Sequence, residues 1–255
     1  MVTVGIIGGT GQMGQFFRKF FEKNRCRVLI SSRKTRLNPV DCARISDVIL
    51  ISVPIKTTAD VIKKVGPGIK KASLLVDTTS IKEEPVNAML KYSKCEVIGM
   101  HPVFGPNASS VKNQAIVLCP ARGKKWLKWI INIFEKNGAK IKISTAKKHD
   151  EMMSIIQGLN HFSTLAVAHA MKKLGVNIKE SLEYTSPIYK LRMVMVGRIL
   201  SQSPDLYAAI EMMNPKNKKV LSAYLDSSKR LREIISKKNT KEFVKYFNEC
   251  ADIFG

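Results

Sequence analysis

One short segment near the start of the chain limits the possible fold more than any other. The apolar residues 4–7 lead directly into the pattern Gly9-x-Gly11-x-x-Gly14, and a segment with phenylalanines along one side follows. Glycines at these positions let the backbone approach a pyrophosphate, whose charge the free N–H groups of the following helix stabilise. The segment therefore predicts a dinucleotide-binding strand, loop and helix. The residues expected to contact the cofactor here are Gly8, Gly9, Thr10, Gly11, Gln12 and Met13.

The rest of the first half alternates apolar runs with amphipathic segments, which is typical of a parallel sheet with crossover helices. Helices are expected after Gly11, at 58–65 and at 124–136. We therefore predict an α/β, Rossmann-like, doubly wound domain over residues 1–147. Its strands are expected at 3–8, 27–32, 47–53, 73–77, 95–100, 115–119 and 140–144.

From His149 onward the apolar residues follow a helical period and no strand is indicated. This pattern predicts an all-α C-terminal domain over residues 148–255. Its apolar positions, including the run 193–196, are more than a domain of this size can cover, so we expect a homodimer through these helices. The expected helices are 149–174, 178–202, 204–213, 216–236 and 240–253.

The residues after the second expected strand indicate which dinucleotide binds. In NAD-binding domains an acidic residue at this place binds the ribose 2′-hydroxyl. Here the chain has Ser32 and Arg33 and no carboxylate, and an arginine fork suits a 2′-phosphate. We therefore predict NADP as the cofactor, with NAD as the alternative.

Polar residues follow three further strands at the edge of the sheet where open α/β sheets bind ligands. Ser52, Val53 and Pro54 follow the third strand and are expected to contact the cofactor. Ser80 follows the fourth strand. His101 follows the fifth, in a loop that two prolines and two glycines are expected to hold rigid.

The helical half supplies a second polar set. Gln157, Asn160, His161 and Thr164 fall at helical spacing within an otherwise apolar segment. Arg198 lies on a helix face that is expected to be buried, where a guanidinium needs an anion. Two readings stay open, a protein carboxylate or a carboxylate on a ligand.

Composition narrows the class of protein. The formal charge is +23, which attracts anions, yet the basic residues are spread along the chain without interleaved aromatic residues. This pattern favours steering of a small anion over binding of nucleic acid. No apolar stretch is long enough to cross a membrane, no secretory leader is indicated, and the five cysteines form no metal-binding pattern. We expect a cytoplasmic protein without a metal site.

Together these motifs resemble the prephenate dehydrogenase family of tyrosine biosynthesis. The resemblance runs from Gly5 to about Asn214, and the histidine-proline segment is its most specific part. The matching motifs are Gly8-Gly9-x-Gly11-x-Met13-Gly14, Asp77-x-x-Ser80-Ile81-Lys82, Gly99-Met100-His101-Pro102-x-Phe104-Gly105-Pro106, His149-Asp150, Gln157-Gly158-Leu159-x-His161-Phe162 and Gly197-Arg198-Ile199-Leu200.

The resemblance implies an oxidative decarboxylation of prephenate, a dicarboxylate, to 4-hydroxyphenylpyruvate. It implies that His101 accepts the proton of the ring hydroxyl and that Ser80 binds this hydroxyl or orients the imidazole. Arg198 would hold the side-chain carboxylate, and His161 with Gln157 would complete the pocket. The alternatives are an arogenate or cyclohexadienyl dehydrogenase, another NADP reductase such as a deazaflavin-dependent one, and, outside the enzymes, a dinucleotide sensor or a nucleic-acid binder.

Overall fold

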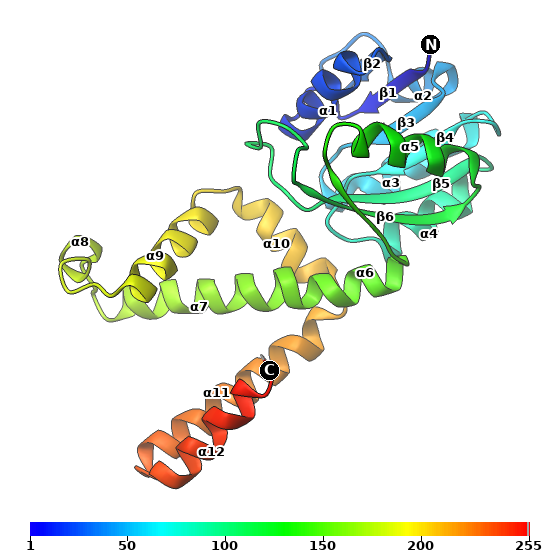
Figure 1. The fold of residues 1–255 in the computed structure, drawn as a ribbon. Helices are drawn as coiled ribbons and strands as arrows, with labels where there is room; N and C mark the ends of the chain where they lie inside the picture. The colour runs from blue at the N-terminus through cyan, green and yellow to red at the C-terminus, as the bar shows by residue number, and fades with distance from the viewer. Residues whose placement is uncertain (254) are drawn as a thin grey trace. The chain divides into compact units, whose positions relative to one another are not determined.

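The computed structural model describes residues 1–253 and residue 255. The chain forms two compact units, which are described separately. The α/β unit comprises residues 1–153 and 203–214, and the helical unit comprises residues 154–202 and 215–255. Figure 1 shows the course of the chain through both.

A seven-stranded sheet forms the centre of the α/β unit, with the strand order β2-β1-β3-β4-β5-β6-β7. Every neighbouring pair is parallel except β5 and β6. All seven expected strands are present, which confirms this part of the prediction. The strands are β1 (Thr3–Ile7), β2 (Arg27–Ser31), β3 (Val48–Ile51), β4 (Leu74–Asp77), β5 (Glu96–Pro102), β6 (Ala115–Arg122) and β7 (Lys140–Ile143).

Helices cover both faces of this sheet because the central strands are apolar on both sides. Val48 and Leu50 of β3 pack in one buried cluster, and the alternating Ile49 and Ile51 pack in another. α1 (Gln12–Lys23) and α5 (Lys125–Glu135) contribute to the first cluster. The second cluster includes residues of α2 (Pro39–Ile45), α3 (Ile55–Val65) and α4 (Glu83–Tyr92), and a short 3₁₀ turn (Gly66–Gly68) follows α3. The doubly wound fold is confirmed.

The sequence pattern predicted a parallel sheet, and for β6 and β7 this was wrong, because both run antiparallel to the other five strands. No helix lies between β5 and β6, and without a crossover helix β6 returns antiparallel to β5. β5 also runs two residues past the predicted end, so His101 lies in the strand opposite Val117 rather than in a loop. His101 is 3% exposed. The sheet itself therefore fixes the backbone of this histidine.

Two further helices complete the α/β unit. α6 (Ala146–Met153) follows β7, and α10 (Pro204–Met213) returns to the unit from the helical half. Ala209 and Ile210 of α10 pack in a buried cluster with Ile55 of α3 and Ile81.

The helical unit begins with a π-helical turn (Ser154–Leu159) that continues as α7 (Asn160–Lys173). The predicted single helix 178–202 was wrong: α8 (Ile178–Ser181) and α9 (Pro187–Leu200) are separate, because Ser186 caps a new helix with proline in its first turn. α11 (Asn217–Ser236) and α12 (Thr240–Ala251) end the chain. α11 packs closely on the π turn, since a Cβ added to Gly158 would lie 2.4 Å from Asn217 Oδ1.

α9 has no buried residue within the chain, although much of its surface is apolar. Ile188 is 81% exposed, Leu191 64% and Val194 61%. Monomeric proteins rarely leave such a face open to water. Among the described residues, no helix is long and apolar enough to cross a membrane.

Candidate active site

The glycine loop between β1 and α1 has a backbone shape that requires glycine. Gly8 has a φ of +88°, and a Cβ at this residue would lie 2.1 Å from the carbonyl oxygen of Ser52. The Gly8 N–H donates to Ser31 O at 2.8 Å. A Cβ at Gly14 would lie 2.5 Å from Gly8 O, so the helix packs directly on the loop. The loop therefore brings the start of α1 against the ends of β2 and β3.

The N-terminus of α1 is open to a ligand. Its N-cap is Gly11, no side chain caps it and no acidic residue lies in its first turn. Asn or Ser side chains cap the N-termini of α2, α8, α9, α10 and α12. An uncapped positive helix end beside a glycine loop fits the pyrophosphate of a dinucleotide. Thr10, Gln12 and Met13, which are predicted to contact the cofactor, lie at this end of α1.

Ser32 and Arg33 form a tight turn directly after β2. The Ser32 N–H donates to Thr35 Oγ1 at 2.8 Å, and Ser32 Oγ accepts from the N–H of Lys34 at 3.1 Å. Arg33 is exposed, and residues 31–37 include no carboxylate. This turn presents positive charge where NAD-binding domains place an acid.

The end of β3 meets the same loop. The N–H of Ser52 donates to Ile7 O at 2.8 Å, and Val53 Cγ1 lies 3.0 Å from a Cβ built on Gly8. Pro54 is the N-cap of α3. The three residues predicted after the third strand are therefore placed beside the glycine loop, and their contact with a cofactor stays a prediction.

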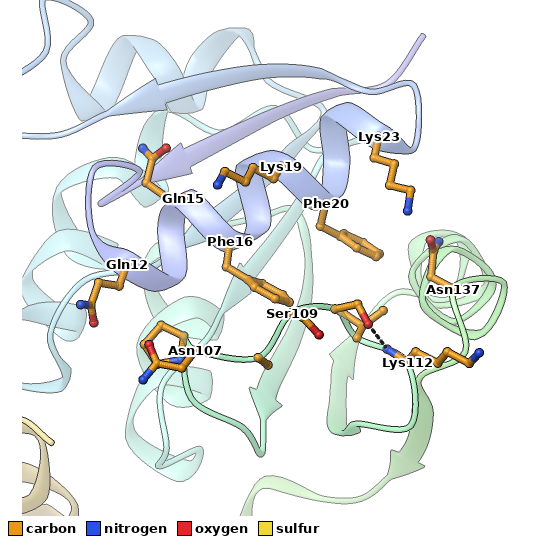
Figure 2. A pocket seen from close by; sticks show the side chains of 14 residues that line it. Gln12, Gln15, Phe16, Lys19, Phe20, Lys23, Asn107, Ser109, Lys112 and Asn137 are labelled. Atoms are coloured by element: carbon orange, nitrogen blue, oxygen red, sulfur yellow. Dashed lines mark hydrogen bonds between the residues drawn. The ribbon is translucent and has the colours of Figure 1, made fainter. Parts of the chain in front are cut away.

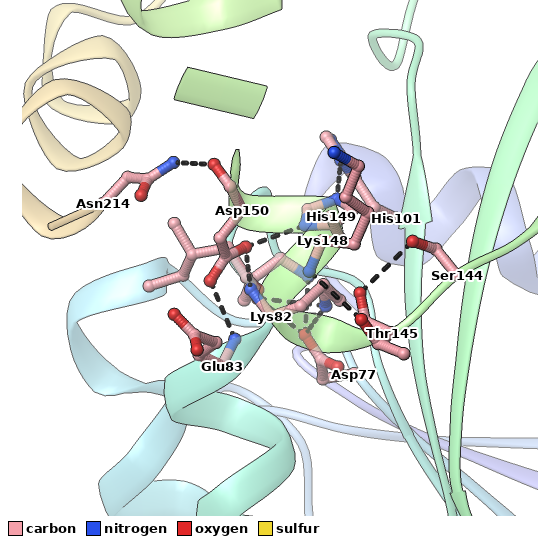
Figure 3. A network of polar contacts seen from close by, with 12 residues as sticks. Asp77, Lys82, Glu83, His101, Ser144, Thr145, Lys148, His149, Asp150 and Asn214 are labelled. Atoms are coloured by element: carbon pink, nitrogen blue, oxygen red, sulfur yellow. Dashed lines mark hydrogen bonds and ion pairs between the residues drawn. The ribbon is translucent and has the colours of Figure 1, made fainter. Parts of the chain in front are cut away.

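His101 belongs to a buried chain of three side chains, shown in Figure 3. His101 Nδ1 lies 2.8 Å from His149 Nε2, and His149 Nδ1 lies 2.8 Å from Asp150 Oδ1. The Asp150 carboxylate also accepts the backbone N–H groups of Lys82 at 2.7 Å and Glu83 at 2.8 Å, at the start of α4. The Asp150 carboxylate therefore ends this series of hydrogen-bonded side chains and also caps α4.

These contacts determine which nitrogen of each imidazole carries the proton. An ionised Asp150 can only accept, so His149 donates to it from Nδ1 and, when neutral, keeps a lone pair on Nε2. That lone pair accepts a hydrogen bond from the N–H at His101 Nδ1. His101 Nε2 is then left unprotonated, as a general base requires.

A buried ion pair lies beneath this chain. Lys82 and Asp77 form it, and neither side chain is exposed. Lys82 Nζ also donates to the carbonyl oxygen of Met100, the residue before His101, at 3.0 Å. Thr79 donates to the same Asp77 carboxylate through its N–H at 3.0 Å. Asn214, after α10, donates to Asp150 O at 2.9 Å.

Both histidines are held in the neutral form near neutral pH. Burial, and then the neighbouring His149 and Lys82, lower the pKa of His101 well below its ordinary value. Burial also lowers the pKa of His149, even though the hydrogen bond to Asp150 acts in the opposite direction. Neutral imidazoles are the form that the hydrogen-bond directions above require.

The remaining predicted residues are distributed as follows. Ser80 is half-buried in the loop between β4 and α4, two residues before Lys82, and its role stays a prediction. In the helical unit, Gln157 lies in the π turn, and α7 buries His161 while Asn160 is exposed. Arg198 was expected on a buried face, and within the chain this was wrong, because Arg198 is exposed and α9 has no buried residue.

Sequence reasoning named His149, Asp150, Asp77 and Lys82 only as parts of motifs and gave them no role. The adjacent His149-Asp150 pair was the one available signal. His101 lies 48 positions from His149, so only the fold shows that His101, His149 and Asp150 are joined by hydrogen bonds.

A groove of about 620 Å³ lies between α1 and residues 106–112, as Figure 2 shows. Its lining includes Gln12, Phe16 and Phe20, with Lys19, Lys23 and Lys112 around them. None of the residues in the His101 chain lines it. The groove reaches the start of α1 and adds positive charge near the glycine loop.

Comparison with known proteins agrees with this geometry. Residues 22–143 match the family described as prephenate dehydrogenase, nucleotide-binding domain, and residues 145–249 match prephenate dehydrogenase, dimerization domain. The chain belongs to the prephenate dehydrogenase family. The site described above therefore lies in the part of the chain that matches its nucleotide-binding domain and at the start of the part that matches its dimerization domain.

Individual relatives support the same assignment. The probable arogenate/prephenate dehydrogenase of Methanocaldococcus jannaschii is 36% identical over 100% of this chain, and the T-protein of Enterobacter agglomerans is 32% identical over 99%. The chain spans 61% and 67% of the length of these two relatives. A crystal structure of Aquifex aeolicus prephenate dehydrogenase with hydroxyphenyl propionate and NAD+ has the same fold, with a TM-score of 0.79, 20% identity and coverage of 98% of this chain and 96% of that one.

The first prediction concerns Asp150. Replacing it by asparagine removes the negative charge that fixes the proton on His149 Nδ1, so the wrong tautomer of His101 becomes accessible. For a reaction that uses His101 as base, Asp150→Asn is expected to lower kcat by about 10²–10⁴-fold. The measurement is steady-state kinetics together with a melting curve. We call the hydrogen-bonded series His101–His149–Asp150 the histidine relay. A folded variant with unchanged kcat would show that this relay does not set the tautomer of His101.

Proposed function

We propose that this chain is a nicotinamide-dependent dehydrogenase that converts prephenate to 4-hydroxyphenylpyruvate by oxidative decarboxylation. The observation that carries the proposal is the neutral, buried His101, whose Nε2 is free to accept a proton. The relay to His149 and Asp150 and the nearby glycine loop support it, as does membership of the family.

In the proposed reaction, His101 is the one base, and it accepts and later returns a single proton. A bound nicotinamide supplies the hydride acceptor for the hydrogen on ring C4. As this hydride leaves, His101 Nε2 accepts the proton of the hydroxyl on the same carbon, so that no cationic ketone builds up. The bond between the ring and its carboxylate then breaks, carbon dioxide leaves, and the bonding electrons make the ring aromatic. His101 returns the proton to the ring oxygen.

The other site residues are proposed to bind and orient the substrate. Ser80 hydrogen-bonds the ring hydroxyl or the imidazole. Arg198 holds the side-chain carboxylate through its planar fork, and His161 and Gln157 complete the pocket. The high positive charge of the chain increases the rate at which a dicarboxylate arrives.

Arogenate is the second candidate substrate, because it differs only by an amine in place of the side-chain keto group. The name of the M. jannaschii relative includes both substrates. A cyclohexadienyl dehydrogenase would accept either.

The second prediction tests the reaction. Purified protein is mixed with prephenate or arogenate and with NADP or NAD, and formation of reduced nicotinamide is followed by absorbance. Rapid reduction with prephenate is expected, and His101→Asn should lower kcat by at least about 10²-fold while cofactor affinity stays nearly constant. Reduction with arogenate alone would assign the substrate differently, and no reduction in any mixture would contradict the proposal.

We propose NADP as the preferred cofactor, because Arg33 stands in an exposed turn where an acid would select NAD. The third prediction follows from this charge. Arg33→Ala removes a charge-assisted contact to the 2′-phosphate and should raise the KM for NADP about 10-fold or more, with little effect on NAD. The matched control is Lys56→Ala in α3. An equal change for both cofactors in Arg33→Ala would remove Arg33 from cofactor selection.

We also propose a homodimer in which a second copy covers the exposed face of α9. The match to a dimerization domain over residues 145–249 and the exposed Ile188, Leu191 and Val194 support it. Burial of such a face stabilises an assembly by roughly 25 cal/mol per Å² of apolar area.

The fourth prediction is that sedimentation at micromolar concentration gives a mass near twice 28.5 kDa. Leu191→Glu should shift the protein towards monomer, because the dimer would bury an unpaired carboxylate. Lys147→Glu in the α/β unit introduces the same side chain elsewhere and should leave the dimer intact. A wild-type monomer would contradict the proposal.

A further inference from the structure

The buried pair of Lys82 and Asp77 is not explained by a gain in stability alone. Pairs of this kind are often less stabilising than apolar side chains of the same volume, because both charges lose their water. Asp77 Oδ1 in addition is buried without a hydrogen-bond partner. A pair that is incompletely satisfied at this position indicates a purpose other than stability.

Lys82 contacts Asp150 at one end of the His101–His149–Asp150 series and the backbone next to His101 at the other. Its backbone N–H donates to Asp150 Oδ1 at 2.7 Å, where the relay ends. Its side-chain Nζ donates to Met100 O at 3.0 Å, one residue before the base His101 in β5. Asp77, at the end of β4, holds this ammonium group in place. Lys82 thus ties β4, β5 and the relay to the start of α4.

The side chain of Lys82 is fully buried. A Cβ added to Gly99 would lie 3.0 Å from Lys82 Cδ, so β5 packs directly against the lysine stem. The ammonium group therefore cannot swing away, and its charge stays at a fixed position beneath His101.

We infer that Lys82 is a positioning residue that keeps His101 unprotonated and correctly oriented, and that Asp77 holds the lysine for this purpose. The inference rests on the proposed function in taking His101 as the base. A fixed positive charge disfavours a second one nearby, and the hydrogen bond to Met100 O fixes the strand on which the imidazole stands.

Other charged and titratable groups also surround His101, and each acts in a known direction. Lys82 lowers the pKa of both histidines, whereas Asp77 and Asp150 raise that of His149. Burial raises the pKa of the Cys119 thiol on β6 to about 12, so it stays neutral. His149 and Lys82 act on His101 directly, whereas Asp77 and Asp150 act on His149, and Cys119 on β6 lies near Lys82, Asp77 and Asp150.

The charge of Lys82 determines the pH range in which His101 stays unprotonated. A base with a lowered pKa stays unprotonated, and therefore active, further into the acid range than an ordinary histidine. Without the positive charge of Lys82, the pKa of His101 rises towards its ordinary value, and the acid limb of activity moves to higher pH.

The fifth prediction uses NMR of the histidines, because this readout needs no substrate. The chain has four histidines, and His101→Asn identifies the signals of His101. Long-range ¹H–¹⁵N spectra over a pH series report the protonation and tautomer of each ring. In the wild type, His101 should stay neutral, with its proton on Nδ1, at a pH where an ordinary histidine is half protonated.

The test variant is Lys82→Met, which keeps the length of the stem and removes the charge. It should raise the pKa of His101 by about one unit, and the double variant Asp77→Asn/Lys82→Met should raise it too. Lys94→Met, which removes an exposed lysine, is the matched control and should leave it unchanged.

The outcomes separate this inference from the proposed function. An unchanged His101 titration in folded Lys82→Met, or in the double variant if the single one fails to fold, overturns the inference. An equal rise in Lys94→Met overturns it as well. A raised pKa only in the variants that lack Lys82 supports it, even if no dehydrogenase activity is found. Where activity is present, the acid limb of kcat/KM should move by the same amount.

Discussion

The carboxylate of Asp150 serves two purposes that the rest of the site depends on. It caps α4 through two backbone N–H groups and accepts a hydrogen bond from Nδ1–H of His149. Hydrogen bonds to a charged group contribute about 1.5–3 kcal/mol each, which offsets the cost of burying the carboxylate. Because the caps fix the carboxylate, they also fix the imidazole of His149, and through it the orientation of His101.

The antiparallel β6 is the second constraint. It lets β5 continue past the point where the parallel strands end, so that His101 is held by strand pairing as well as by the relay. In the proposed reaction, a base fixed by a sheet loses little entropy when the substrate binds, which favours catalysis by positioning. The same packing excludes water and lowers the pKa of His101.

The helical unit presents a different situation. Its π turn and α11 pack closely at Gly158, while α9 exposes a long apolar face. Arg198 lies on the same helix. The apolar pattern of α9 does not form part of the core within one chain, and this exposed face is the basis of the proposed dimer.

The sequence by itself determined the seven strands, the glycine loop and the cofactor end of the sheet, because local periodicity and glycine stereochemistry leave few alternatives. It also singled out His101. It could not determine the direction of β6, the break before Pro187 or the exposure of Arg198, since strand pairing and burial depend on residues distant in the chain. Only the tertiary structure joined His101 to His149 and placed Lys82 beside Asp77 and Met100 O. Hydrogen bonds between side chains 48 positions apart leave no periodic signal, so their chemistry emerges only when the sheet and α6 bring them within reach.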